Sequence, residues 1–180
     1  MCAKNNDLYI TLLRCNDDHH RYRIIMTQRT VRGESVSHTE ILEFKTNERY
    51  SIIPITSEVE RIVSDSGVID GLVLVNPMHI TASIYVNDQE SGLHHDIMQW
   101  LEKVVPYHGP EGRTGPEYRH HMTGEDNGDA HLKRQLLGQQ VVMPITDGQL
   151  HLGTWERIHY AEFDGRRRKR VLVKVTGIAG

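Results

Sequence analysis

The stretch Ile69–Asn76 reads IDGLVLVN and is the strongest apolar run in the chain. Its β-branched residues and nearly continuous hydrophobicity predict a β-strand that is covered on both faces. Pro77 ends this strand, and the loosely alternating stretch His79–Asn87 predicts a second central strand that begins at His79. The apolar run is far too short to cross a bilayer.

Helices are predicted on either side of these two strands. One covers about residues 58–65, where Ser57 opens a capping-box pattern, and a second covers about 92–104 with Ser91 as its cap. A short third helix is predicted over about 130–137.

The rest of the chain is predicted to be β-structure joined by tight turns. Asp-Gly pairs at 147–148 and 164–165 indicate hairpins. The sequence therefore predicts a single α+β domain over residues 1–180, with largely antiparallel β-sheets and two or three helices. Besides the two central strands, the predicted strands are Leu8–Arg14, Arg21–Thr27, Glu40–Lys45, Tyr50–Ile55, Gln140–Pro144, Gln149–Leu152, Trp155–Phe163 and Arg170–Thr176.

Composition narrows the function classes. The formal net charge of -3 gives no basic field for nucleic acid, and the first residues lack the apolar core of a signal peptide. Two cysteines cannot build a disulfide framework or a Cys-x-x-Cys zinc site, whereas there are twelve histidines. We expect a cytoplasmic protein without nucleic-acid or membrane partners, in which any metal is held by His and carboxylate.

The polar stretch Tyr118–His131, YRHHMTGEDNGDAH, is the first candidate for a site. His120 and His131 are eleven residues apart with Asp126 between them, which is no standard zinc spacing, but a loop can still bring them together. Such a set leaves a coordination place open for water or substrate. From spacing alone, a metal site and a solvated loop are equally good interpretations.

Three further places carry weaker signals. A lone His at a strand start, such as His79, is more often structural than a ligand. Glu156 lies in a predicted half-buried strand, and a ligand or acid/base role and a salt bridge to a nearby arginine have equal weight. The cationic run 166–170 is typical of a solvated hairpin tip, but Arg166 and its neighbours could also bind a phosphate group in a bidentate manner.

Several spaced motifs together resemble the YjbQ family, sometimes labelled secondary thiamine-phosphate synthase. The resemblance covers the chain from about Val68 onward and implies a compact α+β homotrimer with a polar, metal-binding pocket at or near a subunit interface. The segments that carry it are HITASIYVND (79–88), HHDIMQWLEKVVP (94–106), YRHH…ED…DAHLKRQLLG (118–138) and PITDGQLHLGTWERIHYAEFDGRRRKRVLV (144–173).

Carried over by position, the resemblance implies His79, His120 and His131 as ligands of a divalent metal ion, either zinc or magnesium. Asp126 is the implied orienting or acid/base group. Glu156 is a second such group, and the family commonly has Gln in its place. The chain also departs from the family's His-Thr-Ser, since Ile80 follows its first motif histidine.

For substrate binding we expect Asn87, Thr154 and Arg166 to contact a small phosphorylated molecule. The family label implies joining a pyrimidine diphosphate to a thiazole phosphate with loss of pyrophosphate. No paired-carboxylate diphosphate motif of the usual kind is present, which is consistent with this reaction being a side activity. Two rivals stay open: a metal-assisted hydrolase of a small phosphorylated or acyl substrate, and a non-enzymatic trimeric metal-binding protein.

Overall fold

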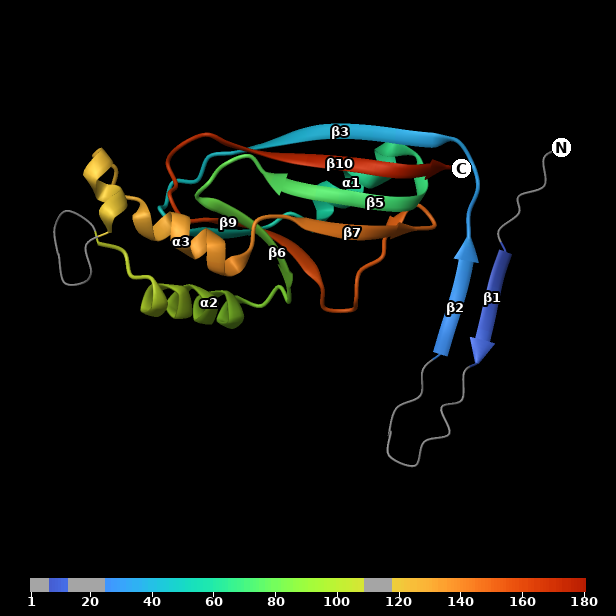
Figure 1. The fold of residues 1–180 in the computed structure, drawn as a ribbon, viewed down its shortest axis with the longest axis horizontal. Coiled ribbons are helices and arrows are strands. Elements are labelled where there is room, and N and C mark those ends of the chain that lie inside the picture. The colour runs from blue at the N-terminus through green and yellow to red at the C-terminus, as the bar shows by residue number, and fades with distance from the viewer. Residues whose placement is uncertain (1–6, 13–24, 109–117) are drawn as a thin grey trace, which may run out of the picture.

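The largest sheet is built around strand β10 (Lys169–Ala179), whose residues alternate between the two faces of the sheet. The computed structural model describes residues 7–12, 25–108 and 118–180, with side chains from residue 29 onward. β10 pairs antiparallel with β3 (Ser35–Phe44) and with β5 (Val68–Pro77). β7 (Val141–Thr146) and the short β8 (Gln149–Leu150) extend the sheet beyond β5 (Figure 1).

A smaller antiparallel sheet packs against one face of this large sheet. Its strands are β4 (Ser51–Pro54), β9 (Arg157–Glu162) and β6 (Ala82–Asn87), with β9 in the middle. Helix α1 (Thr56–Ser66) closes the core between the two sheets. The main buried side chains of this core are Val59, Ile62, Val63, Val73, Val75, Ile84, Ile145, Ile158, Tyr160, Val171, Val173 and Val175.

The remaining helices gather at one end of the molecule. Helices α2 (Ser91–Val104) and α3 (Gly128–Leu137) lie side by side there, with the 3-10 helix η1 (Arg119–Thr123) next to α3 (Figure 1). Leu101 of α2 and Ala130 of α3 belong to a second apolar cluster beside β4 and β9. At the other end, the ribbon of β1 (Asp7–Leu12) and β2 (Ile25–Thr30) extends beyond the two sheets (Figure 1), and Arg29 of β2 contacts the large sheet by donating to Asp147 at 2.7 Å.

The predicted α+β class with largely antiparallel sheets is confirmed, and the described residues contain ten strands and three α-helices. Two local predictions are wrong. The β5 strand is covered on one face only, since Leu72 on its other face is 49% exposed. Neither predicted serine cap is used, because α1 begins after Ile55 and the cap of α2 is Glu90, whose carboxylate accepts hydrogen bonds from the backbone N–H groups of residues 92 and 93.

Parts of two predicted strands, residues 13–14 of Leu8–Arg14 and residues 21–24 of Arg21–Thr27, lie outside the described residues. Within the described ranges, no helix is long and apolar enough to span a membrane.

Candidate functional site

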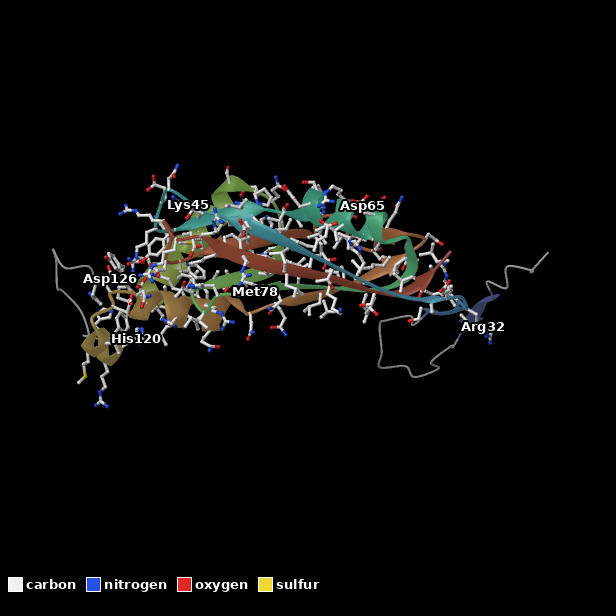
Figure 2. All side chains as sticks on the ribbon, turned by 90° about the horizontal axis from the view of Figure 1, so that it is seen from above. Arg32, Lys45, Asp65, Met78, His120 and Asp126 are labelled. Atoms are coloured by element: carbon white, nitrogen blue, oxygen red, sulfur yellow. The ribbon has the colours of Figure 1, made fainter. Side chains whose placement is uncertain are left out.

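A pocket of about 230 Å³ lies beside the N-terminal end of α3. Four separate parts of the chain supply its walls: the residues before β6, helix η1 with the loop after it, the start of α3, and the turn between β9 and β10. Figure 2 labels His120 at this end of the molecule. The lining residues are His79, Ile80, Thr81, His120, Glu125, Asn127, His131 and Arg167. All three predicted metal ligands therefore line one pocket.

His120 and His131 are direct neighbours in this pocket. Their ring centres are 4.6 Å apart with 67° between the ring planes. Gly124, with a φ of 87°, ends η1 in a left-handed conformation and lets the chain turn back toward α3. Burial, together with the charge that His120 can carry, lowers the pKa of His131, so this imidazole is neutral at pH 7 and keeps a lone pair.

The end of the polar stretch, residues 127–130, is held by a buried network, whereas residues 119, 120 and 122–125 are exposed. Lys133 of α3 is fully buried and donates hydrogen bonds to Asp129 (2.7 Å), Glu102 (2.7 Å) and the hydroxyl of Tyr50 (2.8 Å). Asp129 also accepts from Arg49 at 3.3 Å and from Tyr50 at 2.7 Å. Because every charge in this network has an opposite partner, the start of α3 can be buried without a hydrophobic surface of its own.

His79 is tied to the protein interior through Thr81. Its Nδ1 lies 2.9 Å from the Thr81 hydroxyl and 3.4 Å from the Thr81 backbone N–H. Lys169 in turn donates to Thr81 Oγ1 at 2.7 Å, to the carbonyl oxygen of Asp164 at 2.8 Å, and to the carboxylate of Glu162. The Lys169 and Glu162 side chains are buried, so a buried ion pair lies beneath the part of the pocket wall that His79 and Thr81 form.

On the other side of the pocket, Asn127 and Arg167 are oriented by carboxylates. The Asn127 amide Nδ2 donates to Asp164 Oδ2 at 3.0 Å. Arg167 donates to Glu125 at 3.2 Å and lies 3.7 Å from Asp164 Oδ2. These contacts partly neutralise Arg167 but leave its exposed side chain at the mouth of the pocket, where it can meet an anion.

A second hollow, of about 390 Å³, adjoins the first and shares Arg167 with it. It is lined by Arg49, Tyr107, Asp126, Asp164, Gly165, Arg166 and Arg167. The turn that carries Arg166 packs tightly, since a Cβ at Gly165 would collide with the backbone of Glu48. Arginines from two parts of the chain thus surround one hollow that two carboxylates only partly neutralise.

Asp126 lies in this second hollow and does not line the histidine pocket, whereas its neighbour Glu125 does. Its carboxylate accepts hydrogen bonds from the Tyr107 hydroxyl (2.9 Å) and from Arg49 (3.3 Å). Burial alone would raise the pKa of Asp126, but the Tyr107 hydrogen bond and the Arg49 charge hold it below its usual value. Such a carboxylate is ionised at pH 7 and suits an orienting role better than proton transfer.

The other predicted residues lie elsewhere. Asn87 ends β6 about 20 Å from Thr81 by strand length. Its side chain accepts from the Asp88 backbone N–H at 2.9 Å. Thr154 and Glu156 lie in the turn before β9, near the same end, and Glu156 is exposed and accepts from the Gly153 backbone N–H at 2.7 Å. The half-buried strand predicted for Glu156 is therefore wrong, and one chain does not bring these residues to the histidines.

Sequence reasoning assigned no role to three residues that build or support the pocket: Thr81, Glu162 and Lys169. Only Lys169 has a readable signal, because it lies two residues before Val171 and therefore shares the inward face of β10 with Val171, Val173 and Val175. The cationic run was predicted as a solvated tip, and this is confirmed for 166–168 but wrong for buried Lys169.

The donor set fits a divalent ion only in part. Zn–N bonds of about 2.0–2.1 Å at tetrahedral angles separate two ligating ring centres by about 5 Å. The 4.6 Å separation of His120 and His131 is close to this value. Across the described ranges, however, no three His, Cys, Asp or Glu side chains are grouped so as to enclose a metal ion. The chain therefore offers two imidazole donors and leaves further positions open.

Known proteins of similar sequence and structure belong to one family. The family model described as "UPF0047 protein YjbQ-like" matches residues 40–178. A UPF0047 protein of Archaeoglobus fulgidus is 47% identical over 133 residues, which are 74% of this chain and 97% of that protein. The UPF0047 protein YugU of Bacillus subtilis is 32% identical over 137 residues, 76% of this chain and 97% of that protein.

Solved structures agree with these relatives. A crystal structure from Sulfolobus solfataricus, titled a YbjQ-like protein of unknown function, matches with a TM-score of 0.70 and 30% identity, over 80% of this chain and 99% of that one. A YjbQ/UPF0047 protein from Clostridium acetobutylicum matches with a TM-score of 0.67 and 36% identity, over 76% of this chain and 98% of that one. Since the family model and these relatives cover most of its length, the chain belongs to the YjbQ (UPF0047) family.

Proposed function

We propose that the two adjoining hollows form one site for small phosphorylated substrates, with a divalent metal ion held by His120 and His131. One observation carries the proposal: the histidine-lined pocket and the arginine-lined hollow share Arg167. A phosphate group at Arg167 would therefore lie beside both the paired imidazoles and further guanidinium groups. Arginine binds phosphate with paired, charge-assisted hydrogen bonds, so this arrangement favours phosphorylated molecules over neutral ones.

The paired imidazoles favour zinc over magnesium. Imidazole suits zinc and its transition-metal neighbours, whereas magnesium prefers an octahedral shell of oxygen atoms. When bound, such an ion would supply electrostatic stabilisation of negative charge on phosphate oxygens. The protein's own part is to keep His131 neutral and adjacent to His120, which burial and the η1–α3 turn accomplish.

The arginine-lined hollow supplies the second half of the site. Arg49 is held over the Tyr107 ring, with 3.8 Å between the guanidinium carbon and the ring centre, and it also contacts Asp126. A guanidinium fixed in this way loses little further freedom on binding an anion. Asp126 therefore acts as an orienting group for Arg49, and Arg166 lines the same hollow as a substrate contact.

The reaction to test first is thiamine-phosphate formation. The thiazole nitrogen would form a bond to the pyrimidine methylene carbon, the carbon–oxygen bond would break, and pyrophosphate would leave with the bonding electron pair. Two phosphorylated reactants need two anion-binding places, and the two hollows offer them. Cations beside the leaving group stabilise the charge that develops on it.

A homotrimer is part of the proposal. The outer face of the large sheet exposes apolar side chains from three of its strands: Ile41, Leu72 and Val142. The register places Leu72 and Val142 on neighbouring strands two positions apart, and exposed apolar surface of this kind marks interaction sites in soluble proteins. In an assembly, Asn87, Thr154 and Glu156 of one copy could approach the histidine pocket of the next, which they cannot reach within one chain.

The experiment is a thiamine-phosphate assay with and without chelator, on the wild type and on Arg167→Ala and His131→Ala. His95→Ala is the matched control, because His95 is an exposed histidine of α2 outside both hollows. We expect activity that chelation and both site variants abolish and that the control retains. Activity that is unchanged in His131→Ala would refute the site. If the wild type cleaves phosphoesters but forms no thiamine phosphate, the result would instead support the metal-assisted hydrolase.

A further inference from the structure

We infer that His79 is not a third metal ligand but presents its Nε2–H as a hydrogen-bond donor to an anionic oxygen of the ligand, such as a phosphate oxygen. The inference rests on the proposed function and deepens it, because it divides the pocket into a metal side at His120 and His131 and an anion side at His79 and Arg167.

The Lys169 ammonium directs one of its protons at the Thr81 hydroxyl oxygen. Its ammonium has three N–H donors and three acceptors: the Glu162 carboxylate, the Asp164 carbonyl oxygen and Thr81 Oγ1. Burial lowers the pKa of Lys169, but the hydrogen bond to Glu162 and the charge of this buried carboxylate oppose that shift and favour the charged ammonium. One of its protons is therefore directed at the Thr81 hydroxyl oxygen, which accepts it.

The Thr81 hydroxyl accepts the Lys169 proton and donates its own proton to His79. Its side chain is fully buried, so its own hydroxyl proton needs a protein acceptor. Within the described part of the chain, the acceptor in contact with this hydroxyl is His79 Nδ1, at 2.9 Å. The Thr81 backbone N–H approaches the same nitrogen at 3.4 Å. Two donors facing Nδ1 require a lone pair there, because a proton on Nδ1 would meet the backbone N–H and would leave the Thr81 hydroxyl without an acceptor.

A neutral imidazole carries one proton, which must then be on Nε2. The lone pair that a metal needs is on Nδ1 and is already engaged. Metal-ligating histidines show the reverse arrangement, in which the second ring nitrogen donates to a carboxylate or carbonyl group. Burial and the charge of Lys169 also lower the pKa of His79, which keeps the ring neutral at pH 7. His79 thus offers the pocket a donor.

The experiment combines three readouts on the full chain. Long-range ¹H–¹⁵N NMR of the ring nitrogens reports directly which nitrogen of His79 is protonated. Elemental analysis after zinc loading counts bound metal, and calorimetry with inorganic pyrophosphate measures anion binding. The variants are His79→Ala and His79→Gln, whose side-chain amide places an N–H near the position of Nε2. His95→Gln is the matched control.

We expect protonated Nε2 in the wild type and full zinc content in every variant. Losing a hydrogen bond to a charged group should weaken pyrophosphate binding about 10- to 100-fold in His79→Ala. His79→Gln should stay within about threefold of the wild type because it keeps a donor. Thr81→Val should raise the population of the tautomer protonated on Nδ1, which tests the relay without touching His79.

Two results would overturn the inference alone: a proton on Nδ1 of wild-type His79, or loss of zinc in both His79 variants while the wild type binds zinc and pyrophosphate. A different result, wild type that binds neither zinc nor pyrophosphate, would overturn the proposed function and with it the anion-binding role of His79. The tautomer readout separates these cases because it needs no ligand.

Discussion

Replacing Lys169 by Met should destabilise the protein strongly and specifically. Methionine has a similar length, so packing is largely kept, but three hydrogen-bond donors disappear. Glu162 would keep the Tyr160 hydroxyl (2.6 Å) and the Asp164 backbone N–H (2.9 Å), yet it would remain a buried carboxylate without its cation. Breaking a buried pair in this way costs about 3–5 kcal/mol of unfolding free energy.

The assay is urea unfolding followed by circular dichroism, with thermal melting as a second readout. At about 2–4 °C per kcal/mol for a chain of this size, the melting temperature should fall by roughly 6–20 °C. Lys174→Met is the control, since Lys174 lies on the same strand but is exposed and should change stability by no more than about 0.5 kcal/mol.

A double variant separates charge from packing. Lys169→Met combined with Glu162→Gln leaves no unpaired buried charge, so it should recover part of the lost stability. A single Lys169→Met variant that unfolds within about 1 kcal/mol of the wild type would refute the reasoning, because the ion pair under the pocket would then contribute little.

Further predictions concern three other residues, His159, Arg167 and Leu72. Burial, and next the charge that His94 can carry, lower the pKa of His159. Below about pH 6.5 the unfolded chain therefore binds a proton at this residue that the folded chain excludes, so the unfolding free energy should fall as the pH drops through this value. Urea midpoints compared from about pH 8 to pH 5 should fall more steeply in the wild type than in His159→Phe. His159→Phe should itself be neutral to stabilising at pH 8, since both ring nitrogens of this buried side chain lack hydrogen-bond partners among the described residues; a loss above about 1 kcal/mol would contradict this. Arg167→Lys should weaken pyrophosphate binding about 10-fold, because a point charge replaces a bidentate donor, and equal affinity in calorimetry would argue against a contact at Arg167. Leu72→Glu places a charge on the apolar sheet face and should convert the proposed trimer of the 20.7 kDa chain into monomers in light scattering. A trimer that persists in this variant would exclude this face as the interface.

Local patterns were sufficient for most of the strands, and they failed where tertiary contacts decide. The period-two alternation of β10 is visible in the sequence, but the exposure of Leu72 is not, because it depends on whether anything covers the second face of the sheet. Ser57 has the spacing of a cap, yet the chain enters α1 two residues earlier, where the Ile55 side chain is buried in the core. Apolar packing outweighed a cap worth about 1 kcal/mol.

The candidate site was predictable as a set of residue types but not as an arrangement. His120 and His131 were chosen because they flank a polar loop, and their adjacency arises from the turn at Gly124 and from the buried network around Lys133. No local pattern pairs Lys169 with Thr81, which is 88 residues away in sequence. The roles of His79 and Asp126 follow from such long-range contacts, so spacing alone could not assign them.

The central claim is that His120 and His131 together hold a divalent metal ion. Its most direct test is elemental analysis of the purified protein, on the wild type, on the double variant His120→Ala/His131→Ala and on His95→Ala. We predict close to one equivalent of metal, zinc by donor type, in the wild type and the control, and none in the double variant. Metal-free wild type that is folded, or full metal content in the double variant, would contradict the claim.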